Sequence, residues 1–454
     1  MSLGIILAGI LGAGLGCFIA FSCSPYKRLA IAGAIAVPQF ILPGLPESTS
    51  VFQLWVLLMA LAPGWERAGL RSIYAKLLIL LAILSALAAL WSPLPVIAMI
   101  NAAQIASLAI LAAYAAALFK ENPDGMAKIF GWLGAGVVVQ SLLVILFRLR
   151  PDVEMSFLRS AVGRILIGTE KLGNFFGGSP DNVFDVTKSG GVWVNANTAS
   201  MFLGVAACAF VAAAIRFQKN PFFLVALIAA SAVVPTGSKS GLTLLLMMPL
   251  IGLLVPLLAR GSGRLWIPPV IAIAYPAFLL FKHILDERIP ESLVSDSASS
   301  LGTRGVIWEA AGTLFVQNPF LGLGFGGWGE YFYWASGGAL GRTYPPHNIF
   351  IAAWSDMGTV AAVVLVVFVA AVLLAHIRLT SQTPKRESFA WGFGLAAFLW
   401  LFIHGMADAV TFYGDLRTML IPALLLGLLM AQSRQGVAPS PDSNLSSLPA
   451  GAST

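Results

Sequence analysis

The sequence predicts an all-α polytopic membrane protein with about 12–14 transmembrane helices. Hydrophobic residues make up 58% of the chain and charged residues only 10%, whereas a soluble domain carries roughly 25% charge. The mean hydropathy is +0.86. The apolar runs are continuous, as in residues 75–90, and do not alternate as strands of a membrane β-barrel do. Because lipid offers the backbone no hydrogen bonds, these runs are expected to cross the membrane as helices.

Each crossing of the membrane needs about 20 residues, so each apolar run of about this length is predicted to be one spanning helix. The first run has no basic residues before it, so it is interpreted as a spanning helix rather than a cleaved signal. In chain order, the predicted spans are residues 3–22, 28–44, 51–64, 75–92, 94–118, 129–147, 192–215, 221–236, 240–258, 264–282, 349–375, 388–406 and 417–431.

The basic residues predict which ends of these helices face the cytoplasm. They lie in alternate connections, and the short connections between them contain no Lys or Arg. Because cytoplasmic loops carry an excess of these residues, the two long connections, residues 148–191 and 283–348, are expected to be periplasmic. The basic positions are Lys27, Arg28, Arg67, Arg71, Lys76, Lys120, Lys128, Arg216, Lys219, Arg260, Arg264, Arg378, Lys385 and Arg386.

The remaining composition predicts one transmembrane domain, residues 1–431, and a disordered cytoplasmic tail, residues 432–454, rich in Ser, Pro and Ala. The net charge of +7 does not indicate a nucleic-acid partner, since the cations are scattered through short loops. The three cysteines lie in or beside apolar runs, without the spacing of a zinc site or a disulfide framework. The outer loops lack a carboxylate pair with metal-ligand spacing, so neither a metal nor a cofactor is expected.

The second outer loop contains a predicted amphipathic helix, Thr303–Phe320, with apolar residues at 307, 308, 311, 314 and 315. Thr303 is a suitable cap, and Asn318–Pro319 ends the helix. Arg304 and, one turn later, Trp308 lie at its start, where a guanidinium is suited to an anion at the bilayer surface. The alternative is an arginine that reaches to phospholipid headgroups. The glycine-rich segment that follows, residues 319–331, is interpreted as a tight loop and not a dinucleotide motif.

His347 stands directly before another apolar run. Pro345 and Pro346 keep a helix from beginning earlier, and Asn348 is a good N-cap. The positive end of the helix dipole disfavours the imidazolium, so His347 is a candidate general base. The alternative is a histidine that bonds a loop carbonyl.

Three further polar residues lie at the ends of predicted spans. Lys239 lies in a turn between two spans, and Asn195 and Asn197 lie where the first outer loop enters the membrane. Polar residues at such positions face protein or water rather than lipid. Lys239 and Arg304 together suit a diphosphate, although Lys239 equally suits a structural turn.

Taken in order, three stretches resemble the O-antigen ligase and polymerase-like superfamily. They are TGSKSG at 236–241, LGTRGVIWEAAGTLFVQNPFLGLGFGGWGEYF at 301–332 and PPHNIFIAAWSDMGTVAAVVL at 345–365. The family pattern is a TxSR-like turn, an R-x-x-x-W helix followed by NP-x-x-G-x-G, and an HN-x-[YF] step before a span. The resemblance covers about residues 190–375 and departs from the pattern at Lys239, where the family usually has arginine.

The resemblance implies an inner-membrane enzyme that works at the periplasmic face without a cofactor. Its donor would be a glycan linked to undecaprenyl diphosphate, and its acceptor a glycan, lipid A-core or a protein hydroxyl. His347 matches the catalytic histidine of the family, Arg304 matches an arginine assigned to the donor diphosphate, and Lys239 takes the second cationic position. Asn195, Asn197, Trp308 and Asn348 are candidate substrate contacts. The rival class is a transporter or lipid-glycan flippase, which typically places ionisable groups inside the membrane.

Overall fold

The computed structural model describes residues 3–38, 40–41, 49–177, 187–259, 261–267, 297–341, 343–407 and 418–433, with isolated positions between 267 and 297. Apart from one bridge between Ile41 and Ser50, the secondary structure in these ranges is helical, which confirms the predicted all-α class. The predicted span 264–282 and the tail lie largely outside the described residues.

Six of the described helices are long and apolar enough to cross a membrane: α5 (Pro95–Glu121), α6 (Pro123–Leu149), α10 (Ala196–Phe217), α12 (Lys239–Leu258), α18 (Thr359–Gln382) and α19 (Lys385–Gly405). Shorter apolar helices accompany them: α3 (Val51–Leu61), α4 (Ile73–Ala88), α11 (Pro221–Val233) and α20 (Leu420–Ser433). The first two helices of the chain, α1 (Leu3–Ser22) and α2 (Pro25–Ile35), contact α3. Proline at the first helical position, as in α5, α6 and α11, starts several of them, because its missing N–H is not needed there.

The centre of the bundle is formed by α19 and α10. Their most apolar 18-residue windows are 94% and 89% buried, against 33% for the peripheral α18. The two helices approach closely because Gly204 faces Trp400, and a Cβ at Gly204 would collide with the indole. Small residues allow such close contact, which supplies packing energy where the surroundings are as apolar as the helices.

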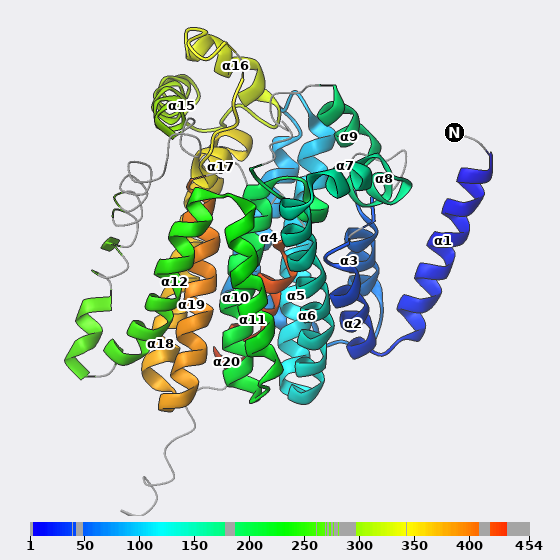
Figure 1. Cartoon of the computed structure of the whole chain (residues 1–454), viewed down its shortest axis with the longest axis vertical. Helices are drawn as coiled ribbons and strands as arrows, with labels where there is room; N and C mark the ends of the chain where they lie inside the picture. The colour runs from blue at the N-terminus through cyan, green and yellow to red at the C-terminus, as the bar shows by residue number, and fades with distance from the viewer. Residues whose placement is uncertain are drawn as a thin grey trace, which may run out of the picture.

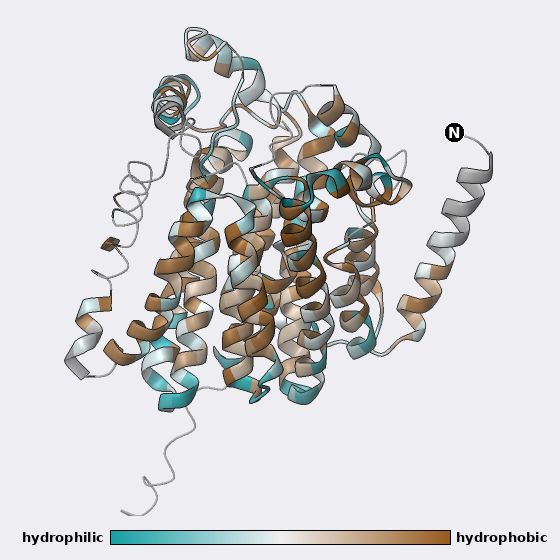
Figure 2. Cartoon of the chain, in the orientation of Figure 1, coloured by the Kyte–Doolittle hydropathy of each residue, from teal (hydrophilic) through white to brown (hydrophobic). Residues whose placement is uncertain are grey.

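The two ends of the bundle differ (Figure 1). At one, which we call the loop end, lie α7 (Pro151–Arg159), α8 (Ala161–Ile167), α9 (Thr169–Phe176), α15 (Ser297–Gln317), α16 (Gly327–Ala335) and α17 (Ile349–Met357). The other, the basic end, contains the last turns of α5 and α10, with Lys120 and Arg216. Both ends are more hydrophilic than the middle of the bundle, where apolar residues predominate (Figure 2).

Two sequence-based assignments are wrong in detail. Arg28, expected in a basic loop, is buried in α2, where its guanidinium donates to the carbonyls of Ala20 and Pro63 at 2.5 and 2.6 Å. The predicted span 349–375 is two helices, because the chain breaks at Gly358, whose φ of +88° lies in the left-handed region. Glycine adopts this conformation without steric cost, so the break follows from the residue itself.

Candidate functional site at the loop end

Arg304 lies on α15, which begins earlier than the sequence predicted. The helix starts at Ser297, so Arg304 occupies its second turn and Thr303 is not its N-cap. The predicted stop is confirmed, since α15 ends at Gln317, directly before Asn318–Pro319. The positive N-terminal end of the helix dipole disfavours a cation, but that effect fades within the first turn, so it opposes the guanidinium only weakly at this position.

The half-buried Arg304 side chain joins α15 to the end of α19. Its Nη2 donates a hydrogen bond of 2.6 Å to the carbonyl oxygen of Ala407, two residues past the end of α19. Ile307 and Ala311, three and seven residues further on, are buried on the same side of α15. Arg304 therefore faces the protein, whereas Trp308 has 42% of its side chain exposed.

One hydrophobic cluster unites α15, α16 and α17. Ile307, Leu314, Trp328, Phe332 and Trp354 are buried together in it. The Trp328 indole also donates to the Tyr344 carbonyl at 2.6 Å, three residues before His347. The helix that carries Arg304 and the segment that leads to His347 are thus held in the same packed unit.

The glycine-rich segment is a structural anchor, as its interpretation as a tight loop predicted. Leu323 and Gly324 donate backbone hydrogen bonds to the Ser355 carbonyl on α17, at 2.7 and 2.9 Å. On the other side, the segment bonds the turn between α4 and α5. The Phe325 carbonyl accepts from the Leu94 N–H at 2.9 Å, and the Phe325 N–H donates to Ser92 Oγ at 2.8 Å. Gly322 and Gly324 have φ of +70° and +77°, and Cβ atoms there would meet neighbouring backbone. We call residues 318–327 the glycine anchor.

His347 is held between two prolines and a capped helix. The Asn348 side chain accepts from the N–H groups of Phe350 and Ile351, so it is the N-cap of α17, as predicted. His347 itself is half-buried and has a φ of +48°. A non-glycine residue held in this region costs of order 1–3 kcal/mol, and such strain gathers at functional sites.

Lys239 is the first residue of α12, after the N-cap Ser238. The turn before it packs against the chain that enters α10, because a Cβ on Gly237 would meet the Thr187 carbonyl oxygen at 2.7 Å. α12 itself packs along α19, the helix whose end receives the Arg304 bond. Lys239 thus belongs to the loop end, on a different element from Arg304 and His347.

Asn195 and Asn348, both candidate substrate contacts, use their side-chain oxygens as helix caps. Asn195 accepts from the N–H groups of Asn197 and Thr198 at 2.9 and 3.0 Å. The cap is supported by Gln140, a residue that sequence reasoning missed: its amide bonds the Gly190 carbonyl and the Val192 N–H at 2.9 and 3.1 Å. An isolated glutamine within the apolar run of α6 was the available signal.

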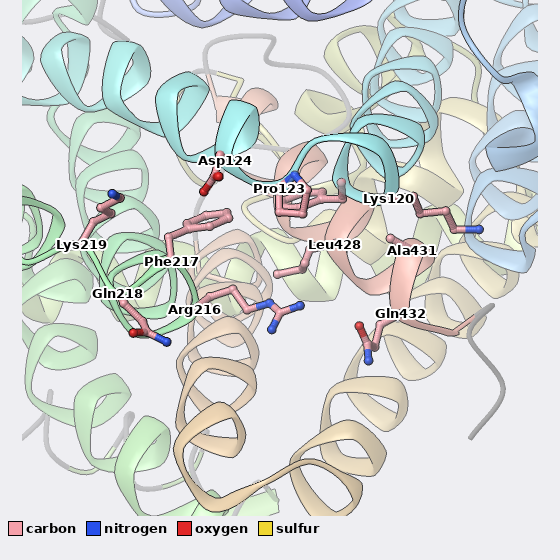
Figure 3. Close-up of a pocket in the computed structure, with 11 residues that line it drawn as sticks. Lys120, Pro123, Asp124, Arg216, Phe217, Gln218, Lys219, Leu428, Ala431 and Gln432 are labelled. Carbon is pink, nitrogen blue, oxygen red and sulfur yellow. The ribbon is translucent and has the colours of Figure 1, made fainter. Parts of the chain in front are cut away.

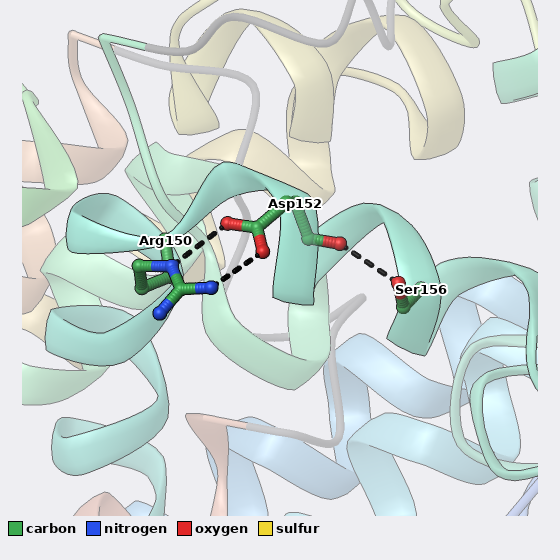
Figure 4. Close-up of polar contacts among 3 residues, drawn as sticks. All are labelled: Arg150, Asp152 and Ser156. Atoms are coloured by element: carbon green, nitrogen blue, oxygen red, sulfur yellow. Dashed lines mark hydrogen bonds and ion pairs between the residues drawn. The ribbon is translucent and has the colours of Figure 1, made fainter.

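The first outer loop folds as α7, α8 and α9, packed around Leu158, Ile167, Leu172 and Phe175. Arg150 and Asp152 form an exposed ion pair of 2.8 Å at the corner between α6 and α7 (Figure 4), and this bond lowers the pKa of Asp152. Two residues after Asp152, Glu154 is buried, and burial raises the pKa of its carboxyl to about 7.

A second missed residue is Asp356, on α17 eight residues after the Asn348 cap. It lies seven residues from Ile349 and three from Ala353, which are both fully buried. Asp356 therefore lies on the side of α17 that faces the protein interior. Its sequence signal was a lone acidic residue inside an apolar run.

Within the described residues, no group of three or more His, Cys, Asp and Glu side chains is arranged to hold a metal ion. The loop end instead carries two cationic residues, Arg304 and Lys239, a histidine with a positive φ, and the N-termini of α10, α12 and α17, whose dipoles favour anions. Fold and site together define a multi-pass helical membrane protein with its motif-bearing residues at one end.

Residues 189–366 match the family model described as O-antigen ligase. The match includes Asn195, Lys239, Arg304 and His347, confirms the resemblance drawn from the motifs, and places this region in the O-antigen ligase-like superfamily. Among curated proteins, none matches the chain significantly. The family implies an enzyme of the glycosyl-transfer type with lipid-linked glycans and acceptors as its general partners, in a multi-pass bacterial membrane protein.

Proposed function

We propose that the protein transfers a glycan from undecaprenyl diphosphate to an acceptor hydroxyl at the periplasmic face of the bacterial inner membrane. The loop end would face the periplasm, and the reaction would make a polymer or ligate one to its acceptor. The observation that carries the proposal is the packing of the Arg304 helix, the glycine anchor and the His347 segment into one unit on the end of α19.

In the proposed reaction, the acceptor oxygen attacks C1 of the donor sugar, and the bond from C1 to the diphosphate oxygen breaks. The hydroxyl proton passes to the His347 imidazole, and undecaprenyl diphosphate leaves with the bonding electrons. Arg304, and Lys239 at the start of α12, would stabilise the charge that develops on the leaving group. Cationic donors that are fixed before the reaction stabilise such charge best, because they need no reorganisation.

The geometry favours this role for Arg304 in a specific way. Its hydrogen bond goes to a neutral carbonyl oxygen, that of Ala407, so this contact leaves the positive charge of the guanidinium unneutralised. The remaining N–H groups of an arginine fork suit the paired oxygens of a diphosphate.

The deciding experiment is glycan transfer by purified His347→Ala protein in detergent, with undecaprenyl-diphosphate glycan and EDTA. Loss of a general base typically lowers the rate by about 10²–10⁴-fold, and we expect a loss of this size. His347→Gln, which keeps a polar side chain without the base, should be equally impaired.

Thermal unfolding of both variants is the control for folding, since a residue outside the packed cores should contribute little to stability. A folded His347→Ala protein with near-normal turnover would contradict the mechanism. The length of the product separates the two reactions within the class, because a polymerase makes repeat-unit chains and a ligase moves an existing chain onto its acceptor.

A further inference from the structure

A cavity of about 570 Å³ opens at the basic end, away from the motifs. It is formed where α5, α10 and α20 end and where α6 begins. Three cations line it, Lys120, Arg216 and Lys219, together with one carboxylate, Asp124. Arg216 reaches into the middle of this space, while Lys120 and Lys219 lie toward opposite edges (Figure 3).

The charges of this cavity are only partly balanced. Arg216 forms an ion pair of 3.0 Å with Glu387 at the start of α19, and both side chains are about one-third exposed. Neither Lys120 nor Lys219 has an ion-pair partner in the part of the chain that the structure describes. Cations in the last turns of helices also compensate the helix dipole, so the charge alone does not define a ligand site.

A neighbouring apolar groove supplies the second observation. It measures about 430 Å³, lies between α10, α11, α12 and α19, and has Gln218 in common with the basic cavity. Its walls include Val211, Phe223, Leu253 and Phe393, and Arg386 lies at the groove as well. Phe223 and Leu253 are 45% and 46% exposed on the apolar helices α11 and α12, so the groove opens on a surface that suits lipid.

Gln218 is where the two spaces meet. It is the C-cap of α10, in the left-handed conformation with φ of +55° and ψ of +43°, and it ends the helix so that its side chain is exposed between the cavity and the groove. The basic cavity suits the headgroup of a phospholipid, and the apolar groove beside it suits one of its acyl chains.

We propose that an anionic glycerophospholipid binds here, with its phosphate among Arg216, Lys120 and Lys219 and one acyl chain in the apolar groove. Phosphate groups suit clustered cations, and basic pockets between transmembrane helices bind anionic headgroups. The apolar groove selects a lipid over a soluble phosphate, because a soluble anion gains nothing from it. The bound lipid would bridge α10 to α11, α12 and α19, and so stabilise the basic end.

The test measures lipid binding to the full-length protein in detergent by native mass spectrometry, with phosphatidylglycerol and phosphatidylcholine as probes. Phosphatidylglycerol should bind saturably and better than phosphatidylcholine. Each cation near an anionic headgroup is worth about 1 kcal/mol, or about fivefold in affinity. Lys120→Gln combined with Lys219→Gln should therefore weaken phosphatidylglycerol binding by about 25-fold.

The matched control is Lys76→Gln combined with Lys128→Gln, which removes the same charge from exposed basic positions that line neither space. It should leave phosphatidylglycerol binding unchanged. Val211→Trp, which fills the groove without altering charge, should weaken binding of the same lipid. If both double variants lose affinity equally, or the tryptophan has no effect, the lipid site is refuted.

Thermal unfolding separates a lipid from a free anion. Phosphatidylglycerol should raise the unfolding temperature of the wild type more than that of the Lys120/Lys219 variant, and inorganic phosphate should not reproduce the rise. Equal stabilisation by inorganic phosphate would overturn the assignment to a lipid.

Discussion

Arginine and lysine supply the same charge in different forms, and this distinction matters at the two cationic positions of the loop end. Arg304 offers a planar fork, of which one nitrogen is already bonded to the Ala407 carbonyl. Lys239 offers a single ammonium at the start of α12. A fork binds two phosphate oxygens at once, whereas an ammonium acts as a point charge.

We therefore expect Arg304→Lys to reduce glycan transfer by at least about tenfold, since charge-assisted bonds are worth about 1.5–3 kcal/mol. Lys239→Arg should be tolerated or beneficial, because it restores the residue type that the family usually has. The measurement is the transfer rate of purified variants at saturating donor. If Lys239→Ala retains wild-type activity, Lys239 has no place in the donor site.

For individual residues, contacts between near neighbours in the chain could be predicted from the sequence, whereas contacts between distant residues could not. The caps at Asn195 and Asn348 follow from short-range rules, and the Asn348 cap was predicted as such. The bond from Arg304 to Ala407 joins residues 103 positions apart, and no periodicity within α15 contains that information.

Among the elements, the short helices of the first outer loop show how burial changes a titration. Glu154 lies on α7, outside the membrane-spanning helices, and its carboxyl pKa is raised from 4.5 to about 7 by burial. Its proton is therefore held more tightly in the folded protein than in the unfolded chain. As pH rises from about 4.5 to about 7, the unfolded chain releases this proton while the folded protein still holds it, so the free energy of unfolding falls through this window and levels off above it.

Glu154→Gln removes this titration and keeps the size of the side chain. We expect the unfolding temperature of the wild type to fall relative to that of Glu154→Gln as pH rises from 5 to 8. Thermal unfolding of both proteins in detergent at the two pH values measures the difference. Asp152→Asn, two residues earlier and exposed, is the control, and should show no such dependence in this window. Identical pH profiles for wild type and Glu154→Gln would contradict the assignment.

Long apolar helices were predictable because about 20 continuous apolar residues leave few alternatives in lipid. The start of α15 was placed six residues late, since Ser297–Gly302 lacks the apolar stripe on which the prediction relied. The break between α17 and α18 was missed because a hydropathy window does not register one glycine. Glycine at position 358 leaves room for the glycine anchor, because a Cβ at Gly358 would collide with the Phe320 carbonyl.

For the whole molecule, the two ends of the bundle differ in structure, because the additional short helices lie at one of them (Figure 1). Which end faces the cytoplasm stays a prediction of the excess of Lys and Arg. Two exposed residues can report the orientation, Ala339 at the loop end and Ser381 at the basic end.

We expect a single cysteine at position 339 to react with an impermeant thiol reagent in intact cells, and one at 381 to be protected until the membrane is opened. The three native cysteines, Cys17, Cys23 and Cys208, are first replaced by alanine. Transfer activity of the cysteine-free protein is the control for folding. Protection at 339 together with labelling at 381 would reverse the orientation and remove the proposed periplasmic reaction.

The glycine anchor also bears on how such a protein can be divided or recombined. Residues 189–366 carry the family match, yet the anchor within them is bonded to Ser92 and Leu94, and Arg304 to Ala407, all outside that range. The recognisable signature is therefore not a self-sufficient module. A chimera that grafts this segment into another bundle would therefore also need the turn between α4 and α5 and the end of α19. Substitutions in that turn are constrained by a partner more than two hundred residues away, and those at the end of α19 by a partner about one hundred residues away.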